Sequence, residues 1–211
     1  MNRSTTNHVQ REYDRLAPTY DDRWSSYIDV TLSRTLDSLQ FDGNEHVLDV
    51  PVGTGELAVR LLKTWPRLRI DGVDLSPQML QQAAAKRSLS TVELHEACVT
   101  ELPFPDNEFD CVFCVNSFHY FREPRSALAE IRRVLRDGGR LVLADWCDDY
   151  LACKLCSFWL RIVDPAFHRT YTQRSCETLL AKSDFQILDV RRFRVDWVWG
   201  MMRFETRAGL G

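Results

Sequence analysis

The chain has 211 residues and a mass of 24.6 kDa, which favours one α/β domain over two independent enzymatic domains. Hydrophobic residues make up 45% and charged residues 27%, a composition that is typical of a soluble globular protein and excludes a disordered or fibrous one. The net charge of −3 provides no field of one sign to hold a nucleic acid or an anionic membrane, so neither partner is expected.

Residues 1–11 are polar, and apolar runs such as 141–144 are much shorter than a membrane span. We therefore expect no secretory signal, no membrane span and a cytoplasmic location. The seven cysteines are an odd number, which favours reduced thiols in that setting.

In chain order, short apolar runs alternate with amphipathic stretches. The predicted strands cover residues 46–50, 69–74, 92–98, 109–116, 140–146, 186–194 and 197–206. The predicted helices cover residues 56–64, 76–87, 124–135 and 174–182, and the aromatic segment 147–173 is predicted to be a helical cover over the strand ends. Ser76 as N-cap and Pro77 predict the start of the second helix, and Asp137-Gly138-Gly139 predicts the stop of the third. This alternation predicts an α/β fold with a mostly parallel sheet and helices on both faces, because parallel neighbours need crossover connections. Ligands of such sheets bind at the carboxyl ends of the strands.

The turn after the first predicted strand contains Gly53-x-Gly55-x-x-Ala58. Its glycines let a ligand approach the backbone, and the following helix directs N–H groups at anionic atoms. Asp74 ends the next strand, where a carboxylate can accept hydrogen bonds from ribose hydroxyls. An NAD site or a purely structural turn has the same pattern. A site for another ribose-containing ligand, an NAD site and a structural turn therefore all stay open.

Four motifs occur together in a fixed order: Asp49-x-x-x-Gly53-x-Gly55, Gly72-Val-Asp74-Leu-Ser-Pro77, Leu102-Pro-Phe104-Pro-Asp-Asn-x-Phe109-Asp110, and the segment from Arg133 to Asp145. This combination resembles the class I S-adenosylmethionine-dependent methyltransferases, and in particular the group that is similar to the ubiquinone and menaquinone biosynthesis enzymes. The opening segment 13–21 is similar to that group as well. The resemblance implies one domain over residues 1–211, with a Rossmann-like, doubly wound sheet of seven strands, an antiparallel closing strand and a helical cap formed by residues 1–40.

The resemblance also implies S-adenosylmethionine as cofactor. By this resemblance Asp49 and the glycine turn hold its methionine end, Asp74 grips the ribose, and Leu75 lies on the adenine face. The remaining positions implied are Cys98 and Val99 at the adenine edge, Asn116, Ser117 and His119 near the reactive methyl, and Tyr20 closing over the site.

Two residues depart from the pattern of the family. Pro51 replaces a glycine of the turn, and its ring fixes φ and removes a backbone donor close to the cofactor. Cys98 replaces an Asp or Asn, and a thiol is a poor acceptor for the adenine amino group. We therefore expect weaker cofactor binding than usual, and a degenerate binding or regulatory module is an alternative function.

The leading hypothesis is methyl transfer to a small acceptor that is apolar or aromatic, with the methylated atom left open. The donor is already activated, so a general base is needed only if the acceptor loses a proton. His119 and Asp145 are the candidate catalytic residues, and His168 is a further candidate base. Trp24, Trp146 and Trp159 are interpreted either as an acceptor pocket or as core.

Two other functions fit the residues less well. An NAD-dependent reductase would use Tyr150-x-x-x-Lys154 as its catalytic pair, but the chain lacks the glycine pattern of that family. A metal or dithiol site is considered at two C-x-x-C pairs, Cys111/Cys114 and Cys153/Cys156. The first pair should point to opposite faces of a strand and the second is interpreted as packing, so no metal is expected.

Overall fold

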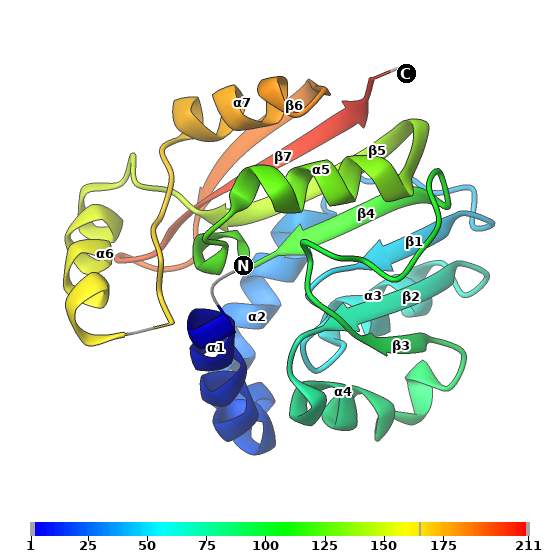
Figure 1. Ribbon diagram of the computed structural model, residues 1–211, viewed down its shortest axis with the longest axis horizontal. Helices are drawn as coiled ribbons and strands as arrows, with labels where there is room; N and C mark the ends of the chain where they lie inside the picture. Colours follow the sequence, from blue (N-terminus) through cyan, green and yellow to red (C-terminus); the bar gives the residue numbers. More distant parts are fainter. Residues whose placement is uncertain (1–2, 165, 210–211) are drawn as a thin grey trace.

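The computed structural model describes residues 3–164 and 166–209 of the chain. One sheet of seven strands runs through it in the order β3-β2-β1-β4-β5-β7-β6 (Figure 1). The strands are β1 His46–Asp49, β2 Arg69–Asp74, β3 Glu93–Glu96, β4 Phe109–Val115, β5 Leu135–Trp146, β6 Phe185–Arg194 and β7 Gly200–Ala208. Every pairing is parallel except those of β7, which is antiparallel to both of its neighbours. The predicted doubly wound fold with an antiparallel strand near the end of the chain is confirmed.

The helices are α1 Arg3–Leu16, α2 Tyr20–Leu36, α3 Glu56–Thr64, α4 Pro77–Ala84, α5 Pro124–Val134, α6 Leu151–Val163 and α7 Gln173–Lys182. Short 3-10 helices cover Ala17–Thr19, Arg87–Leu89 and Phe118–Tyr120. In Figure 1, α5 and α7 lie in front of the sheet, whereas α2 and α3 lie behind it. Both faces of the central strands are therefore covered, which explains why β4 is almost continuously apolar.

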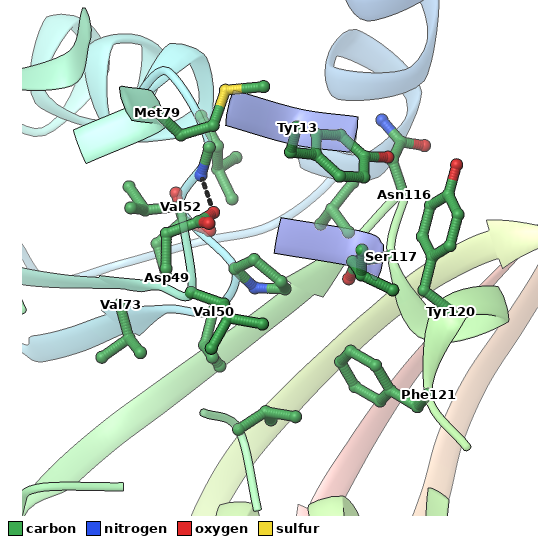
Figure 2. A pocket seen from close by; sticks show the side chains of 18 of the residues that line it. Tyr13, Asp49, Val50, Val52, Val73, Met79, Asn116, Ser117, Tyr120 and Phe121 are labelled. Atoms are coloured by element: carbon green, nitrogen blue, oxygen red, sulfur yellow. Dashed lines mark hydrogen bonds between the residues drawn. The ribbon is translucent and has the colours of Figure 1, made fainter. Parts of the chain in front are cut away.

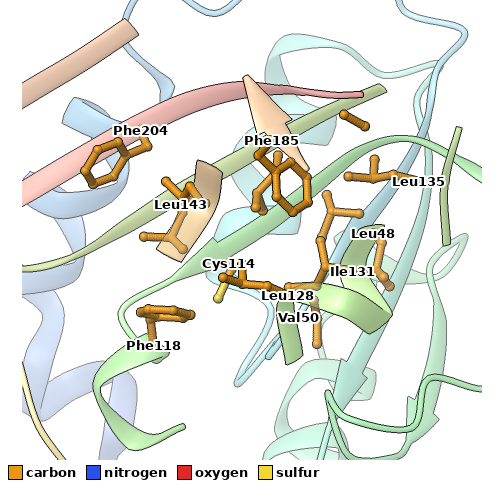
Figure 3. Packing of buried hydrophobic residues seen from close by; sticks show 14 of the residues in the cluster. Leu48, Val50, Cys114, Phe118, Leu128, Ile131, Leu135, Leu143, Phe185 and Phe204 are labelled. Carbon is orange, nitrogen blue, oxygen red and sulfur yellow. The ribbon is translucent and has the colours of Figure 1, made fainter. Parts of the chain in front are cut away.

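Side chains of adjacent strand residues alternate between two hydrophobic clusters, one on each face of the sheet. Leu48, Cys114 and Leu143 pack with residues of α5 and α7, as Figure 3 shows for part of this cluster. Their neighbours Val47 and Phe113 pack with residues of α2 and α3 on the other face. A period of two residues produces this division directly.

The cysteine pair of β4 follows the same alternation. Cys111 is buried in the cluster with α3, and Cys114 is buried in the cluster with α5. Their sulfur atoms are therefore on opposite faces, as the strand period predicted. Burial raises the pKa of each thiol to about 12, so both are neutral packing groups at neutral pH.

Several element boundaries differ from the prediction, and β3 is shorter than expected, ending at Glu96 rather than 98. Helix α4 ends at Ala84 rather than 87, and a separate 3-10 turn follows it. Strand β5 begins at Leu135 rather than 140, because buried Leu135 pairs with Phe109 before a register shift. The expected stop at Asp137-Gly138-Gly139 is instead an irregularity within β5, where Gly138 has a φ of 72°.

The last strand begins at Gly200 rather than 197. The carboxylate of Asp196 accepts hydrogen bonds from the N–H groups of Val198 and Trp199, each at 2.7 Å, and closes a turn there. Among the described residues, no helix is both long enough and apolar enough to cross a membrane.

Candidate cofactor site

A cavity of about 240 Å³ opens at the carboxyl ends of β1, β2 and β4. It is lined by these residues of the predicted cofactor site: Tyr20, Asp49, Pro51, Gly53, Asp74, Leu75, Cys98, Val99, Asn116 and Ser117. In Figure 2, Asp49, Val52 and Met79 lie on one side of the cavity, and Asn116, Tyr120 and Phe121 lie on the opposite side. The fold thus brings together segments that are up to about a hundred residues apart in the sequence.

The turn after β1 is fixed by glycine conformations and by hydrogen bonds to β2. Gly53 and Gly55 have φ values of 54° and 82°, which L-residues with side chains rarely adopt. A Cβ atom on Gly55 would lie 2.4 Å from Leu89 Cδ1, so this glycine lies behind the cavity wall and allows close packing there. The N–H groups of Val52 and Gly53 donate to Val73 O and Asp74 Oδ2, both at 2.8 Å.

Asp74 is a buried carboxylate at the end of β2. Its two oxygens accept hydrogen bonds from the backbone of Gly53 and Ser76, each at 2.8 Å. Burial raises the pKa of Asp74 to about 6, although these backbone hydrogen bonds act in the opposite direction. Each carboxylate oxygen has two lone pairs, so Asp74 retains capacity to accept from a ligand hydroxyl.

Asp49 is buried in the same wall, and its Oδ2 atom has no hydrogen-bond partner among the described residues. Burial, together with the nearby charge of Asp74, raises the pKa of Asp49 well above its ordinary value. A buried acid with an unpartnered oxygen beside a second buried acid is a costly arrangement unless a cation or hydrogen-bond donors enter the cavity. The ammonium group and the sulfonium of S-adenosylmethionine supply such a charge, so these residues fit that cofactor.

The two unusual residues, Pro51 and Cys98, both line the cavity. The peptide bond between Val50 and Pro51 is cis. The sulfur of Cys98 lies 3.3 Å from Thr100 Oγ1, so the position of the expected acceptor is occupied by a thiol that already has a local partner.

Three tyrosines and one methionine complete the cavity wall, and the sequence prediction had included only Tyr20 among them. Tyr13 of α1 lies edge-on to the ring of Tyr120, with 5.5 Å between the ring centroids. Met79 is buried in α4. Tyr13 and Tyr20 belong to different helices, but both lie in the opening segment 13–21, whose similarity to the family could have indicated a shared site.

Hydrogen bonds and ion pairs fasten the first two helices to the site loops. Ser76 Oγ accepts from the N–H of Met79 at 3.1 Å, as predicted for the N-cap of α4, and donates to Asp14 of α1 at 2.6 Å. Asp21 of α2 accepts from Thr54 Oγ1 at 2.5 Å and pairs with Lys86 Nζ at 2.7 Å. Helices α1 and α2 are thereby held across the cavity.

His119 and Asp145 form a buried pair that lies outside the residues lining the cavity. His119 Nδ1 and Asp145 Oδ1 are 2.6 Å apart, and Asp145 also accepts from the backbone N–H groups of His119 and Trp146. The expectation that His119 lines the space near the methyl group therefore differs from the structure, because Asp145 draws the imidazole behind the wall. Its Nε2 has no hydrogen-bond partner within the described chain.

Asn116 lines the cavity, but its amide is engaged elsewhere. Tyr27 donates to Asn116 Oδ1 at 3.1 Å, and Asn116 Nδ2 donates to Thr31 Oγ1 at 3.1 Å. Trp146 Nε1 donates to Tyr27 at 2.7 Å, so one network links Asn116 to the ring stacked on His119. This network rigidifies the end of β4.

Several alternative assignments lie away from the cavity. Trp24 and Trp159 are exposed and do not form a pocket with Trp146, which stacks between His119 and Trp199. Tyr150 and Lys154, the pair weighed for a reductase, are not among the lining residues. His168 is half-buried, and burial lowers its pKa, as do nearby arginines.

The comparisons with known proteins agree with this geometry. Residues 47–139 match the family described as "Methyltransferase domain". The chain is 43% identical over 103 residues to the demethylmenaquinone methyltransferase of Deinococcus radiodurans, covering 47% of this chain and 42% of that protein. It is 32% identical over 177 residues to the enzyme of the same name from Chlamydia trachomatis, covering 80% of this chain and 76% of that one.

A solved structure supports the fold. The putative methyltransferase in complex with the Haloferax volcanii Trm112 methyltransferase activator is similar with a TM-score of 0.85 and 20% identity, covering 96% of this chain and 98% of that one. The match to the Chlamydia protein is not confined to the glycine turn but extends over most of the chain. The chain therefore belongs to the class I S-adenosylmethionine-dependent methyltransferases of the ubiquinone and menaquinone type.

Proposed function

We propose that this chain transfers a methyl group from S-adenosylmethionine to a small, quinone-like aromatic acceptor. The observation that carries the proposal is the cavity at the strand ends, where Asp49 with its unpartnered oxygen faces a largely apolar wall. The relatives named as demethylmenaquinone methyltransferases support the acceptor class. The stretch matched in Deinococcus is less than half of that protein's length, so the acceptor is part of the proposal.

The cavity residues divide into three groups in this proposal. Asp49 and the turn with Pro51 and Gly53, shaped by Gly55, hold the methionine end through charge. Asp74 accepts from the ribose hydroxyls, while Leu75, Cys98 and Val99 surround the adenine. Asn116, Ser117 and Tyr20 border the space where the acceptor meets the methyl group.

When bound, S-adenosylmethionine supplies a methyl group that is already activated by its positive sulfur. The protein's task is to align an acceptor atom with that group and to exclude water. Tyr13, Tyr20 and Tyr120 close the cavity on the side of the amino-terminal helices. In this proposal residues 1–40 form the cap, within one domain over residues 1–211. No described residue of the predicted cover 147–173 lines the cavity.

We further propose His119, oriented by Asp145, as the acceptor of the proton that an aromatic acceptor releases. Because the carboxylate accepts from Nδ1, the lone pair of Nε2 is free to take a proton. The His119 ring contacts Tyr120, a wall residue, with 4.1 Å between centroids. His119→Gln should lower kcat while leaving the affinity for S-adenosylmethionine unchanged.

The test of the function is incubation of the protein with S-adenosylmethionine and a water-soluble demethylated quinol. The proposal predicts S-adenosylhomocysteine in solution and one added methyl group on the quinol by mass spectrometry. Cofactor binding with no product from any quinol would exclude the quinone class. Absence of both binding and product would favour the second candidate, a degenerate binding module, which Pro51 and Cys98 in the cavity wall support.

A further inference from the structure

Helix α6 presents an apolar face that no described residue covers. Its five members are 58–73% exposed and recur at helical spacing: Leu151, Leu155, Phe158, Trp159 and Ile162. The opposite side of the helix is anchored, because Cys153 and Ser157 are buried. A folded chain does not usually leave such a contiguous apolar stripe in water, so the face indicates an interaction surface.

The turn between β6 and β7 extends this face. The guanidinium of Arg194 lies 4.9 Å from the centroid of the Tyr150 ring, at the start of α6, and Gly200 packs against the same ring. The turn carries Trp197, which is 81% exposed. Figure 1 shows α6 at one side of the molecule next to this turn, away from α3 and α4.

Cationic side chains gather where α6 ends. Arg161 lies in the last turn of α6, and the backbone N–H groups of His168 and Arg169 donate to His119 O, three residues before Arg122. Burial lowers the pKa of His168, and the charges of Arg122, Arg169 and Arg161 lower it further. Within residues 3–164 and 166–209 none of these arginines forms an ion pair with a carboxylate. The acid at the end of α6, Asp164, accepts hydrogen bonds from the backbone N–H groups of Ala166 and Phe167. Arg122 also lines the cofactor cavity, beside exposed Glu123.

We infer that α6, together with Trp197, docks on the surface of an anionic lipid bilayer. An amphipathic helix with Trp, Phe and Leu on one face and Lys154 and Arg161 at its flanks is the composition of helices that lie in the membrane interface. The arginine cluster is complementary to anionic headgroups.

Docking on a bilayer would also decide how the acceptor reaches the cavity, a point that rests on the proposed function. Arg122 lines the cofactor cavity and follows the 3-10 helix Phe118–Tyr120, whose His119 carbonyl accepts from the backbone N–H of Arg169, so the inference places the docked face beside the cavity mouth. A lipid-soluble quinone would then reach the cavity from the bilayer without crossing water. The net charge of −3 predicts no overall attraction to an anionic membrane. The positive charges of Arg122, Arg161 and Arg169 come from three separate segments, so their effect is local and was not visible in the total charge.

The test is co-sedimentation of the full chain with vesicles, without cofactor or acceptor. We expect binding to vesicles that contain phosphatidylglycerol, weaker binding to phosphatidylcholine alone, and release by salt. The double variant Phe158→Asp/Trp159→Asp should bind the vesicles more than tenfold more weakly than the native chain. The double variant Arg161→Glu/Arg169→Glu should lose about fivefold or more in vesicle binding for each positive charge that is removed. Leu188→Asp and Arg87→Glu, at exposed sites outside this face, serve as matched controls and should bind like the native chain.

Equal sedimentation of the native chain and the α6 variants would overturn the inference, as would dimerisation through α6 without vesicle binding. Thermal unfolding of each variant checks that the exposed substitutions leave the fold intact. Methylation of a water-soluble quinol should be the same in the native chain and in Phe158→Asp/Trp159→Asp. Vesicle binding without any methylation would contradict the proposed function but would still support the docking surface.

Discussion

Asp74 joins two segments of the candidate site by accepting hydrogen bonds from Gly53 and Ser76. In Asp74→Ala the ribose loses its carboxylate partner and both backbone donors lose their acceptor. We expect the affinity for S-adenosylmethionine to fall at least about tenfold, with loss of the rise in Tm that the ligand gives the native chain. Differential scanning fluorimetry measures this, with exposed Asp42→Ala as the control. An unchanged rise in Tm would show that the ribose binds elsewhere.

The protonation of Asp74 predicts how cofactor binding depends on pH. Its pKa is raised to about 6 by burial, so the free protein loses the carboxylate charge as the pH falls through that value. Ribose hydroxyls and a cationic ligand both favour the ionised form, so the affinity should decrease between pH 7 and pH 5. Calorimetric titration over this range should also detect proton release on binding near pH 6. A flat profile in the native chain would contradict this assignment.

Cys98 offers a direct test of the adenine edge. A carboxylate accepts from the adenine amino group far better than a thiol, so Cys98→Asp should tighten S-adenosylmethionine binding by about tenfold. Cys98→Ala is the matched control and should bind about as well as the native chain. Calorimetry measures the dissociation constants of the native chain and both variants. Weaker binding in Cys98→Asp would mean that Cys98 does not lie at the adenine edge.

At the scale of the element, helices α1 and α2 depend on a few polar contacts to stay over the cavity. Asp21 links α2 to Thr54 and Lys86, whereas its neighbour Asp22 is exposed. Asp21→Ala should therefore weaken cofactor binding several-fold, mainly through faster dissociation, while Asp22→Ala should not. Surface plasmon resonance with immobilised protein measures both rates. Equal dissociation rates for the two variants would show that this contact does not hold the cap.

The elements differ in how far the sequence could predict them. Strands such as β2 and the N-cap of α4 were predicted closely, because the period of two and the Ser-Pro start are local signals. The extension of β5 to Leu135 depends on pairing with Phe109, and the orientation of His119 depends on Asp145. Neither contact is encoded within its own segment. The exposed face of α6 was visible as apolar residues, but periodicity does not say whether a face is covered.

At the scale of the whole molecule, a second polar cluster joins β1, β2 and β3 and lies outside the residues that line the cofactor cavity. Asp71 of β2 is buried between two imidazoles, with His46 Nε2 of β1 at 2.6 Å and His95 Nε2 of β3 at 2.9 Å. Burial alone would raise the pKa of Asp71, but the hydrogen bonds from the two histidines outweigh it and leave the pKa below its ordinary value. One carboxylate thereby ties three neighbouring strands together.

This cluster predicts a loss of stability that is separable from ligand binding. Asp71→Ala removes the carboxylate from Nε2 of half-buried His95 and of buried His46, whose Nδ1 keeps Glu108, and should lower the free energy of unfolding by about 1–3 kcal/mol at pH 7. Because the folded-state pKa of Asp71 is lowered, its charge contributes stability above the unfolded-state pKa of about 4, and this contribution is lost as the pH falls through the folded-state value. The difference between native chain and variant in urea unfolding should therefore be smaller at pH 3 than at pH 7. Asp71 is not a cavity residue, so the rise in Tm with S-adenosylmethionine should persist in the variant. A deficit that stays constant with pH would show that packing at Asp71, and not its charge, stabilises the strands.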